Sequence, residues 1–387
     1  MKFGLFYELS VPKPWDHESS YRVYQEALEQ IELADELGFD QVWAVEHHFL
    51  EEFSHCSAPE VFLAAAAART KHIRLGHGIV PLLPSMNHPA RVAERAAVLD
   101  LVSHGRLEFG TGRASTWTEQ GGFRVDPDAT KEMWDEGLRV IPKMWMNDIF
   151  SYQGKYSSMP PRNVVPKPLQ KPHPPLWVAV SSPETALQAA ERGIGLLGIS
   201  FGTPRDQQER LLEYRKVIKN CEPVGAFVNE QVNTLTWMYC HEDDEQGFKT
   251  ASQLMADFNF LSLHTVTPKQ VYPSRTFKYL GGAFETFRKN PSSMDEGPKL
   301  QRNGAAVGNP ESIIKNIKQW EELGVDRLMF FVAYGNRLPQ DDVKRSMRMF
   351  AKEVMPKFGV FPPGENGAKG GGKDKAKAAT VPASRGG

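Results

Sequence analysis

Short apolar runs alternate with longer amphipathic segments along most of the 387-residue chain. The runs are rich in β-branched and aromatic residues and too short for helices, so each predicts a buried strand. Strands are expected at residues 2–7, 41–45, 73–80, 107–110, 176–180, 195–199, 232–239 and 326–332.

Helical spacing of apolar residues fills the intervals between these strands. Residues 21–37 are the clearest example, because Val23, Ala27 and Ile31 repeat at helical intervals and Gly38 follows. Further helices are expected at residues 59–69, 89–103, 129–146, 183–192, 205–220 and 340–357, and from about residue 243. This succession of strand–helix units predicts an α/β fold, a closed (β/α)8 TIM barrel, rather than an open doubly wound sheet.

Unusual polar and glycine clusters fall where the predicted strands end. They occupy residues 46–48, 76–78, 110–113, 180–182 and 334–336. In a (β/α)8 barrel the carboxyl ends of the strands and the following loops form the active site, so these clusters are expected to meet at one face.

Two segments depart from the regular pattern. Residues 1–360 are expected to form one barrel domain, followed by a disordered tail at 361–387 that is rich in Gly, Lys, Ala and Pro. Residues 262–301 are too long for an ordinary connection and are interpreted either as a mobile lid or as a plain surface insertion.

The charges are balanced, with 46 Lys+Arg against 47 Asp+Glu. The formal net charge of −1 gives no field that would attract nucleic acid or an anionic membrane, and neither is expected as a partner. The 3 cysteines form no disulfide framework, and no signal peptide or membrane span is visible. A soluble, cytoplasmic protein is therefore expected.

The segment after the fifth predicted strand carries hydroxyl groups. Ser182 is typical of a helix N-cap, with Pro183 in the first helical position. Simple capping explains this pattern. The alternative is a phosphate site, in which Ser181, Ser182 and Thr185 bind an anion at a helix N-terminus. Glu184 must then point to solvent.

The glycine-rich segment 110–113 is not a dinucleotide fingerprint, because Ser115 stands where that motif needs a glycine. Arg113 supplies a planar guanidinium that suits a phosphate. The glycines either let a ligand approach the backbone or relieve crowding at the barrel rim.

Adjacent histidines, His47 and His48, follow the second predicted strand. Neighbouring side chains on a strand end project to opposite sides, and no metal-ligand spacing supports them, so no metal site is predicted. A buried, hydrogen-bonded histidine is one interpretation. The favoured one is a histidine at the barrel mouth that acts as an acid, a base or a hydrogen-bond donor.

Several motifs, in one order along the chain, resemble the bacterial luciferase-like, flavin-dependent monooxygenases. The motifs are Leu-Gly-Phe-Asp-Gln-Val-Trp at 37–43, Glu-His-His-Phe at 46–49, His-Pro-Ala-Arg-Val-Ala-Glu at 88–94, residues 99–106, Gly-Thr-Gly-Arg at 110–113, residues 179–193, Gly-Asn-Pro-Glu at 308–311 and Leu-Gly-Val-Asp at 323–326. The resemblance covers nearly the whole chain before the tail. It implies a (β/α)8 barrel, usually dimeric, that binds reduced FMN, reacts it with O2 and oxygenates a small organic substrate.

The resemblance also assigns roles to residues. His47 matches the family's active-site histidine, Arg113 a flavin-phosphate arginine, and Ser182 and Thr185 the phosphate-binding hydroxyls. Gly78 and Ile79 fall where the family often places an unusual backbone bend beneath the isoalloxazine ring. 

Departures from the luciferase pattern bear on the reaction. Gly112 replaces the cysteine beside the arginine in luciferase α chains, which weighs against light emission.

The family's mobile loop falls within residues 262–301. An alanine-rich helix, with Ala64 to Ala68 in succession, either packs closely inside the chain or forms a homodimer interface.

The predicted function is an FMNH2-dependent monooxygenase acting on a small, largely apolar substrate. A separate flavin reductase is expected to supply the reduced cofactor, because the chain shows no nicotinamide fingerprint. Three alternatives stay open: a deazaflavin-dependent hydride-transfer enzyme, a metal-dependent barrel hydrolase, and a flavin-binding barrel without catalysis.

Overall fold

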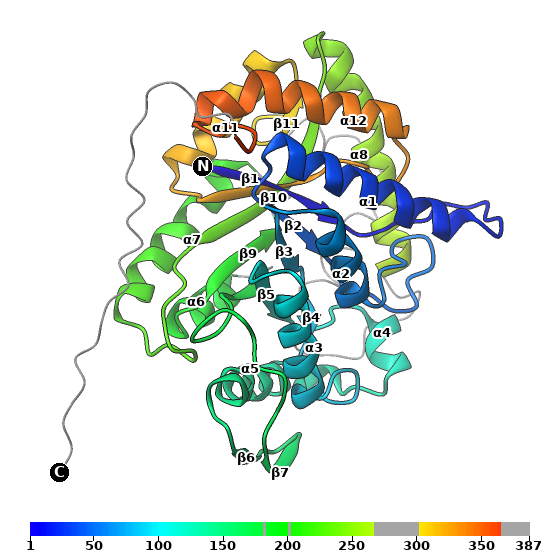
Figure 1. Ribbon diagram of the computed structural model, residues 1–387. Coiled ribbons are helices and arrows are strands. Elements are labelled where there is room, and N and C mark those ends of the chain that lie inside the picture. Colours follow the sequence, from blue (N-terminus) through cyan, green and yellow to red (C-terminus); the bar gives the residue numbers. More distant parts are fainter. Residues whose placement is uncertain (181–182, 200–202, 267–301, 365–387) are drawn as a thin grey trace.

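Parallel strands close into a barrel in the computed structural model, which describes residues 1–180, 183–199, 203–266 and 302–364 (Figure 1). Its strands, in order around the ring, are β1 (Lys2–Tyr7), β2 (Gln41–Ala44), β3 (Arg74–His77), β5 (Leu107–Gly112), β8 (Leu176–Val180), β9 (Gly195–Ile199), β10 (Val232–Cys240) and β12 (Arg327–Phe331). The ring closes because β10 pairs with both β9 and β12, and β12 also pairs with β1. The predicted (β/α)8 barrel and its strands are confirmed.

Two strand boundaries differ from the prediction. The third predicted strand is broken by a bend at Gly78 into β3 and the short β4 (Val80–Pro81). Strand β5 continues to Gly112, two residues further than predicted, because Thr111 pairs with Val80 on one side and with Val178 on the other. Pairing on both sides outweighs the weak strand preference of the glycines.

Helices cover the outside of the barrel (Figure 1). The predicted helices are present as α1 (Ser19–Leu37), α2 (Pro59–Arg69), α3 (Pro89–Val102), α5 (Thr130–Met146), α6 (Pro183–Glu191), α7 (Pro204–Val217), α8 (Asp244–Val266) and α12 (Gln340–Met349). Short helical turns extend α7 over Ile218–Asn220 and α12 over Phe350–Val354 and Met355–Phe358. In the described part of the chain, no helix is long and apolar enough to cross a membrane.

The structure adds elements that the periodicity did not predict. They are α4 (Trp117–Gly122), a helical turn at Pro127–Ala129, the hairpin of β6 (Phe150–Gln153) and β7 (Ser158–Arg162), β11 (Ala306–Gly308) and α11 (Pro310–Glu322). The hairpin is mostly solvent-exposed and shows no run of buried apolar positions to mark it.

The two irregular segments of the prediction are only partly described. Residues 262–266 are the last residues of α8, so the predicted insertion begins inside a helix, and its remainder lies outside the described residues. The tail lies outside them from residue 365. Before it, the backbone of Phe361 packs against Gly38.

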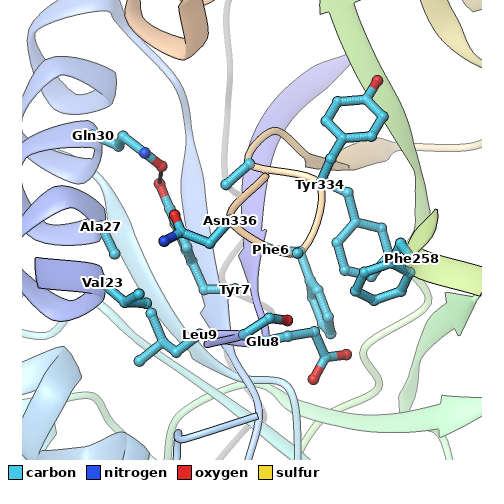
Figure 2. A pocket seen from close by; sticks show the side chains of 14 residues that line it. Phe6, Tyr7, Glu8, Leu9, Val23, Ala27, Gln30, Phe258, Tyr334 and Asn336 are labelled. Atoms are coloured by element: carbon cyan, nitrogen blue, oxygen red, sulfur yellow. Dashed lines mark hydrogen bonds between the residues drawn. The ribbon is translucent and has the colours of Figure 1, made fainter. Parts of the chain in front are cut away.

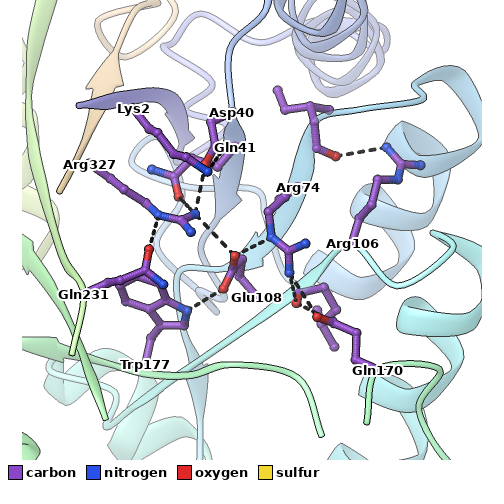
Figure 3. A network of polar contacts seen from close by, with 12 residues as sticks. Lys2, Asp40, Gln41, Arg74, Arg106, Glu108, Gln170, Trp177, Gln231 and Arg327 are labelled. Atoms are coloured by element: carbon purple, nitrogen blue, oxygen red, sulfur yellow. Dashed lines mark hydrogen bonds and ion pairs between the residues drawn. The ribbon is translucent and has the colours of Figure 1, made fainter. Parts of the chain in front are cut away.

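A buried polar network fills the barrel near the amino ends of its strands (Figure 3). Glu108, which is 1% exposed, pairs with Arg74 and Arg327 and accepts a hydrogen bond from Trp177 Nε1 at 2.7 Å. Arg327 also donates to Asp40 at 3.0 Å. The network and the tryptophan ring close this end of the barrel, so an active site belongs at the opposite end.

We predict that Glu108→Gln lowers the free energy of unfolding by about 3–5 kcal/mol, because it leaves the buried guanidinium of Arg327 and the partly buried one of Arg74 without their shared carboxylate. Urea unfolding followed by circular dichroism measures the change. The surface variant Glu132→Gln is the matched control and should unfold like the wild type. Equal stability of both variants would show that the network contributes nothing.

Candidate functional site

Side chains from separate strands converge on His47 at the carboxyl end of the barrel. Glu8 follows β1, His47 lies in the loop after β2, and Glu119 belongs to α4 after β5. His47 Nδ1 lies 3.0 Å from Glu119 Oε1, and His47 Nε2 lies 3.5 Å from Glu8 Oε2. The ring also packs against Phe53, with centroids 5.6 Å apart. The imidazole is thus held between two carboxylates.

Helix α4 positions Glu119. Thr116 caps this helix by accepting a hydrogen bond from the Glu119 amide at 3.2 Å, and its hydroxyl donates to Glu119 Oε2 at 2.5 Å. The backbone amide of His48 donates to Glu119 Oε1 at 3.1 Å. Sequence reasoning missed Glu119, although Thr116 and Glu119 have the Thr-x-x-Glu spacing of a capping box.

His48 turns toward a different group of partners. Its Nε2 lies 3.2 Å from Glu46 Oε1, which also accepts a hydrogen bond from Asn87 Nδ2 at 2.6 Å. Arg95 binds the other end of the Asn87 amide and pairs with Glu60 at 2.8 Å. The two histidines therefore have separate surroundings, and in the described residues no group of His, Cys, Asp and Glu is arranged as a metal site.

The carboxylates set the charge of His47. Burial of the ring lowers the pKa of His47. The negative charge of Glu119 and its hydrogen bond raise that pKa, and the charges of Glu8 and Glu46 add to the rise. Together they outweigh burial and bring the pKa of His47 to about 9. Burial would raise the pKa of Glu119, but the His47 charge and several hydrogen bonds hold that pKa below its ordinary value. His47 is therefore an imidazolium ion at neutral pH, which makes it a proton or hydrogen-bond donor rather than a base.

Glu8 has a different environment from Glu119. It is 9% exposed, and its Oε2 atom has no hydrogen-bond partner among the described residues. Burial raises the pKa of Glu8 to about 7, because the attraction of the charged His47 only partly offsets it and Glu119 adds to the rise. Glu8 thus changes its charge near neutral pH while Glu119 stays ionised.

A small cavity of about 30 Å³ lies beside Glu8. Apolar rings form part of its wall, among them Phe6, Phe258, Phe331 and Tyr334. Figure 2 shows the Glu8 carboxylate below Phe6 and turned away from Gln30.

Arg113 and Thr185 lie at the ends of neighbouring strands. Strands β5 and β8 are parallel, and Thr111 pairs with Val178. The half-buried Arg113, which directly follows β5, therefore lies at the same height in the barrel as the end of β8. Arg113 donates to Thr130 Oγ1 at 3.2 Å, and Thr185 lies in the first turn of α6.

The charge near this helix start suits an anion. Glu184 is largely exposed and pairs with Lys131 at 2.7 Å, so its charge points outward, as a phosphate site requires. Ser181 and Ser182 lie outside the described residues. The donors that are described, a guanidinium and a hydroxyl at a helix N-terminus, fit a phosphate group.

Gly78 and Ile79 form the bend between β3 and β4. A Cβ atom at Gly78 would lie 3.1 Å from the Phe6 ring, so this backbone faces the barrel interior beside Phe6. A Cβ at Gly112 would lie 2.9 Å from Ile79 Cδ1, and one at Gly110 would overlap a backbone carbonyl of β3. The glycines of β5 therefore relieve crowding against β3 and against Ile79 in the bend after it, which favours the rim interpretation over an open cradle for a ligand.

Comparisons with known proteins agree with this architecture. The chain is 25% identical to the oxygenase component of flavin-dependent trigonelline monooxygenase from Acinetobacter baylyi, over 92% of this chain and 96% of that protein. The solved structure of monooxygenase RslO1 from Streptomyces bottropensis gives a TM-score of 0.75 at 28% identity, over 92% of this chain and all of that one. An F420-dependent glucose-6-phosphate dehydrogenase from Amycolatopsis mediterranei is 23% identical over 84% of this chain and 92% of its own length.

The family model of the luciferase-like monooxygenases matches residues 1–327. This match spans the barrel from β1 to the first residue of β12. It confirms the predicted class of enzyme, a flavin-dependent monooxygenase, at the level of the family. The chain belongs to the luciferase-like monooxygenase family.

Proposed function

We propose that this protein is an FMNH2-dependent monooxygenase whose reduced cofactor comes from a separate flavin reductase. The observation that carries the proposal is the arrangement at one barrel end, where a charged imidazole follows β2 and phosphate-type donors follow β5 and β8. His47 would act on the reacting molecule, and Arg113 and Thr185 would hold the anionic end of the cofactor.

The cofactor-binding residues of the proposal are those predicted from the sequence. Arg113 and Thr185 would bind the FMN phosphate, together with Ser181 and Ser182. The backbone at Gly78 and Ile79 would support the flavin ring, because it faces the barrel interior beside Phe6.

When bound, reduced FMN would supply the two electrons for the reduction of O2, with one oxygen atom entering the substrate and the other leaving as water. The chain's own contribution is to bind, to exclude water and to hold a proton. Phe6, Phe258 and Phe331 place apolar rings around the small cavity beside Glu8, which would favour an apolar substrate next to it and limit the entry of water. His47 Nε2 lies 3.5 Å from Glu8, which lines this cavity.

A separate reductase is supported by the two-component relative. The trigonelline enzyme is named as an oxygenase component, and this chain has no nicotinamide-binding motif. Cys56, Cys221 and Cys240 are free thiols, which suits the reducing cytoplasm that we propose as its location.

The test is oxidation of candidate aldehydes, ketones, terpenes and aromatic compounds with FMNH2 and a flavin reductase, read by the mass of the product. We expect a gain of one oxygen atom, with O2 consumed in step. His47→Gln should lower turnover at least about tenfold while FMN binding changes little.

Omitting FMN is the control and should abolish oxidation. Reduced F420, which the dehydrogenase relative uses, is the competing cofactor. Turnover with reduced F420 but not with FMNH2 would instead favour hydride transfer.

A second prediction concerns the phosphate site. Arg113→Met should weaken FMN binding about ten- to a hundredfold, because it removes a charge-assisted contact to the phosphate. Riboflavin, which lacks the phosphate, is the matched ligand and should bind both proteins equally. Fluorescence titration measures both affinities. Equal FMN binding by variant and wild type would remove Arg113 from the site.

We also propose a homodimer formed through the outer faces of α2 and α3. Val61 on α2 and Val98, Leu101 and Val102 on α3 are exposed apolar side chains on these neighbouring helices. The alanine run of α2 is only partly explained by packing inside the chain, since Ala66 and Ala67 are buried and Ala68 is exposed. A shared apolar face of this kind is typical of a protein interface.

We therefore expect the wild type to have twice the mass of one chain in light scattering. Val98→Glu combined with Leu101→Glu should give a monomer, because the charges would be buried at the interface. Leu212→Glu on α7, also at an exposed position, is the control and should leave the dimer intact. A wild-type monomer would contradict the proposal.

A further inference from the structure

The His47 ring is held differently on its two sides. On one side Glu119 lies within hydrogen-bond distance of Nδ1, at 3.0 Å. On the other, Glu8 lies 3.5 Å from Nε2, close enough for an ion pair but without a hydrogen bond. The two carboxylates therefore cannot have the same effect on the ring.

We infer that Glu119 is a positioning residue that keeps His47 charged and fixes its orientation, and that Glu8 exchanges a proton with His47 Nε2. This inference deepens the proposed function and rests on it. Neither Glu119 nor Glu8 was identified from the sequence as a site residue.

Glu119 is suited to a fixed role because it is fully buried and has several donors. His47 Nδ1, the His48 amide and the Thr116 hydroxyl all lie within hydrogen-bond distance of its two oxygens. An ionised carboxylate only accepts hydrogen bonds, so Nδ1 carries a proton whether the ring is charged or neutral. The nitrogen that gains and loses a proton is then Nε2, which faces Glu8.

Glu8 is suited to the exchange because one of its oxygen atoms lacks a donor. In the described part of the chain its Oε2 is buried without a hydrogen-bond partner, and such a carboxylate oxygen is costly unless a proton or a donor reaches it. A movement of about half an ångström would turn the 3.5 Å contact with Nε2 into a hydrogen bond. Glu8 also lies beside the cavity, where about one water molecule fits.

Other titratable groups face His47 as well. Glu46 lies on the same loop but binds His48 and Asn87. Cys56, whose carbonyl accepts from the His47 amide, has a thiol whose pKa is raised well above its usual value by burial, then by Glu8, Glu46 and Glu60. That thiol stays protonated, so of the groups near the ring Glu8 is the one suited to exchange a proton with Nε2.

The step itself is a proton transfer. The Nε2–H bond of His47 breaks as the proton binds an oxygen atom of the reacting substrate, and Nε2 keeps the electron pair. The ring is then neutral and still protonated at Nδ1. The Glu8 carboxylic acid next gives its proton to Nε2 and becomes a carboxylate, which solvent protonates again. The higher pKa of His47, about 9 against about 7 for Glu8, makes this return favourable.

The decisive experiment is an NMR titration of isotope-labelled histidine in the full-length, flavin-free protein, with the His47 signal assigned by His47→Gln. In the wild type we expect a midpoint near 9 and a second inflection near 7 from Glu8. Glu119→Gln should lower the midpoint by at least about one pH unit. Glu8→Gln should remove the inflection and lower the midpoint less.

Matched variants keep the result interpretable. Glu119→Asp keeps the charge and should hold the midpoint close to the wild-type value, and Glu132→Gln on the surface should change nothing. A neutral His47 at pH 7 in the wild type, or an unchanged midpoint in Glu119→Gln, overturns the positioning role. An unchanged inflection in Glu8→Gln overturns the exchange. If Glu119→Gln does not fold, the His47 midpoints of the wild type and of Glu119→Asp decide whether Glu119 has the positioning role.

The pH profile of substrate oxidation gives a second readout. In Glu119→Gln the alkaline limb should move from about 9 toward 6.5, the ordinary value for histidine, with activity recovered at lower pH. A merely structural loss would lower the rate at every pH. A charged His47 in a protein that oxidises nothing with FMNH2 refutes the proposed function alone, whereas a neutral His47 in an active oxygenase refutes this inference alone.

Discussion

Closure of the strand ring is the constraint on which the rest of the structure depends. Strand β12 pairs with both β1 and β10. Arg327 at its start reaches Glu108 on β5, Gln41 on β2 and Asp40 just before β2. These contacts hold distant parts of the chain at one end of the barrel. Because the strands are parallel, fixing their amino ends also fixes where their carboxyl ends emerge, and Glu8, His47 and Glu119 meet only for that reason.

The same closure explains how the site tolerates several buried charges. A lone carboxylate in such a place would take up a proton, as the raised pKa of Glu8 shows. Glu119 avoids this because α4 presents it to donors from two segments of the chain. The cost of burying its charge is offset by fixed hydrogen bonds, and the charge of His47 follows from that of Glu119. One short helix therefore determines the protonation state of the imidazole.

The sequence predicted the barrel well because strand and helix periodicity are local properties. It also placed His47 and Arg113 at strand ends, since that depends only on where each strand stops. Glu8 and Glu119 escaped detection because each lies far from His47 along the chain, and only the barrel brings them together. Glu119 had a local signal in its capping-box spacing, but that signal predicts a helix start rather than a partner for a histidine. The role of the glycines of β5 was ambiguous from the sequence for a similar reason. The atoms that would crowd a side chain at Gly110 or Gly112 belong to His77 of β3 and to Ile79, which lie far from them along the chain.

Strand β5 connects the polar network at one end of the barrel to the candidate active site at the other end. Glu108 near its start binds the guanidinium groups that close the barrel, and Gly110 and Gly112 allow β3 and β4 to pack against it. Arg113 follows the strand directly, and Glu119 lies six residues further on. The proposed phosphate donor and the carboxylate that charges His47 thus follow one strand, the first directly and the second in the short helix α4. A cofactor held by Arg113 and an imidazole oriented by Glu119 would keep a fixed separation, which is what a reaction between two bound molecules requires.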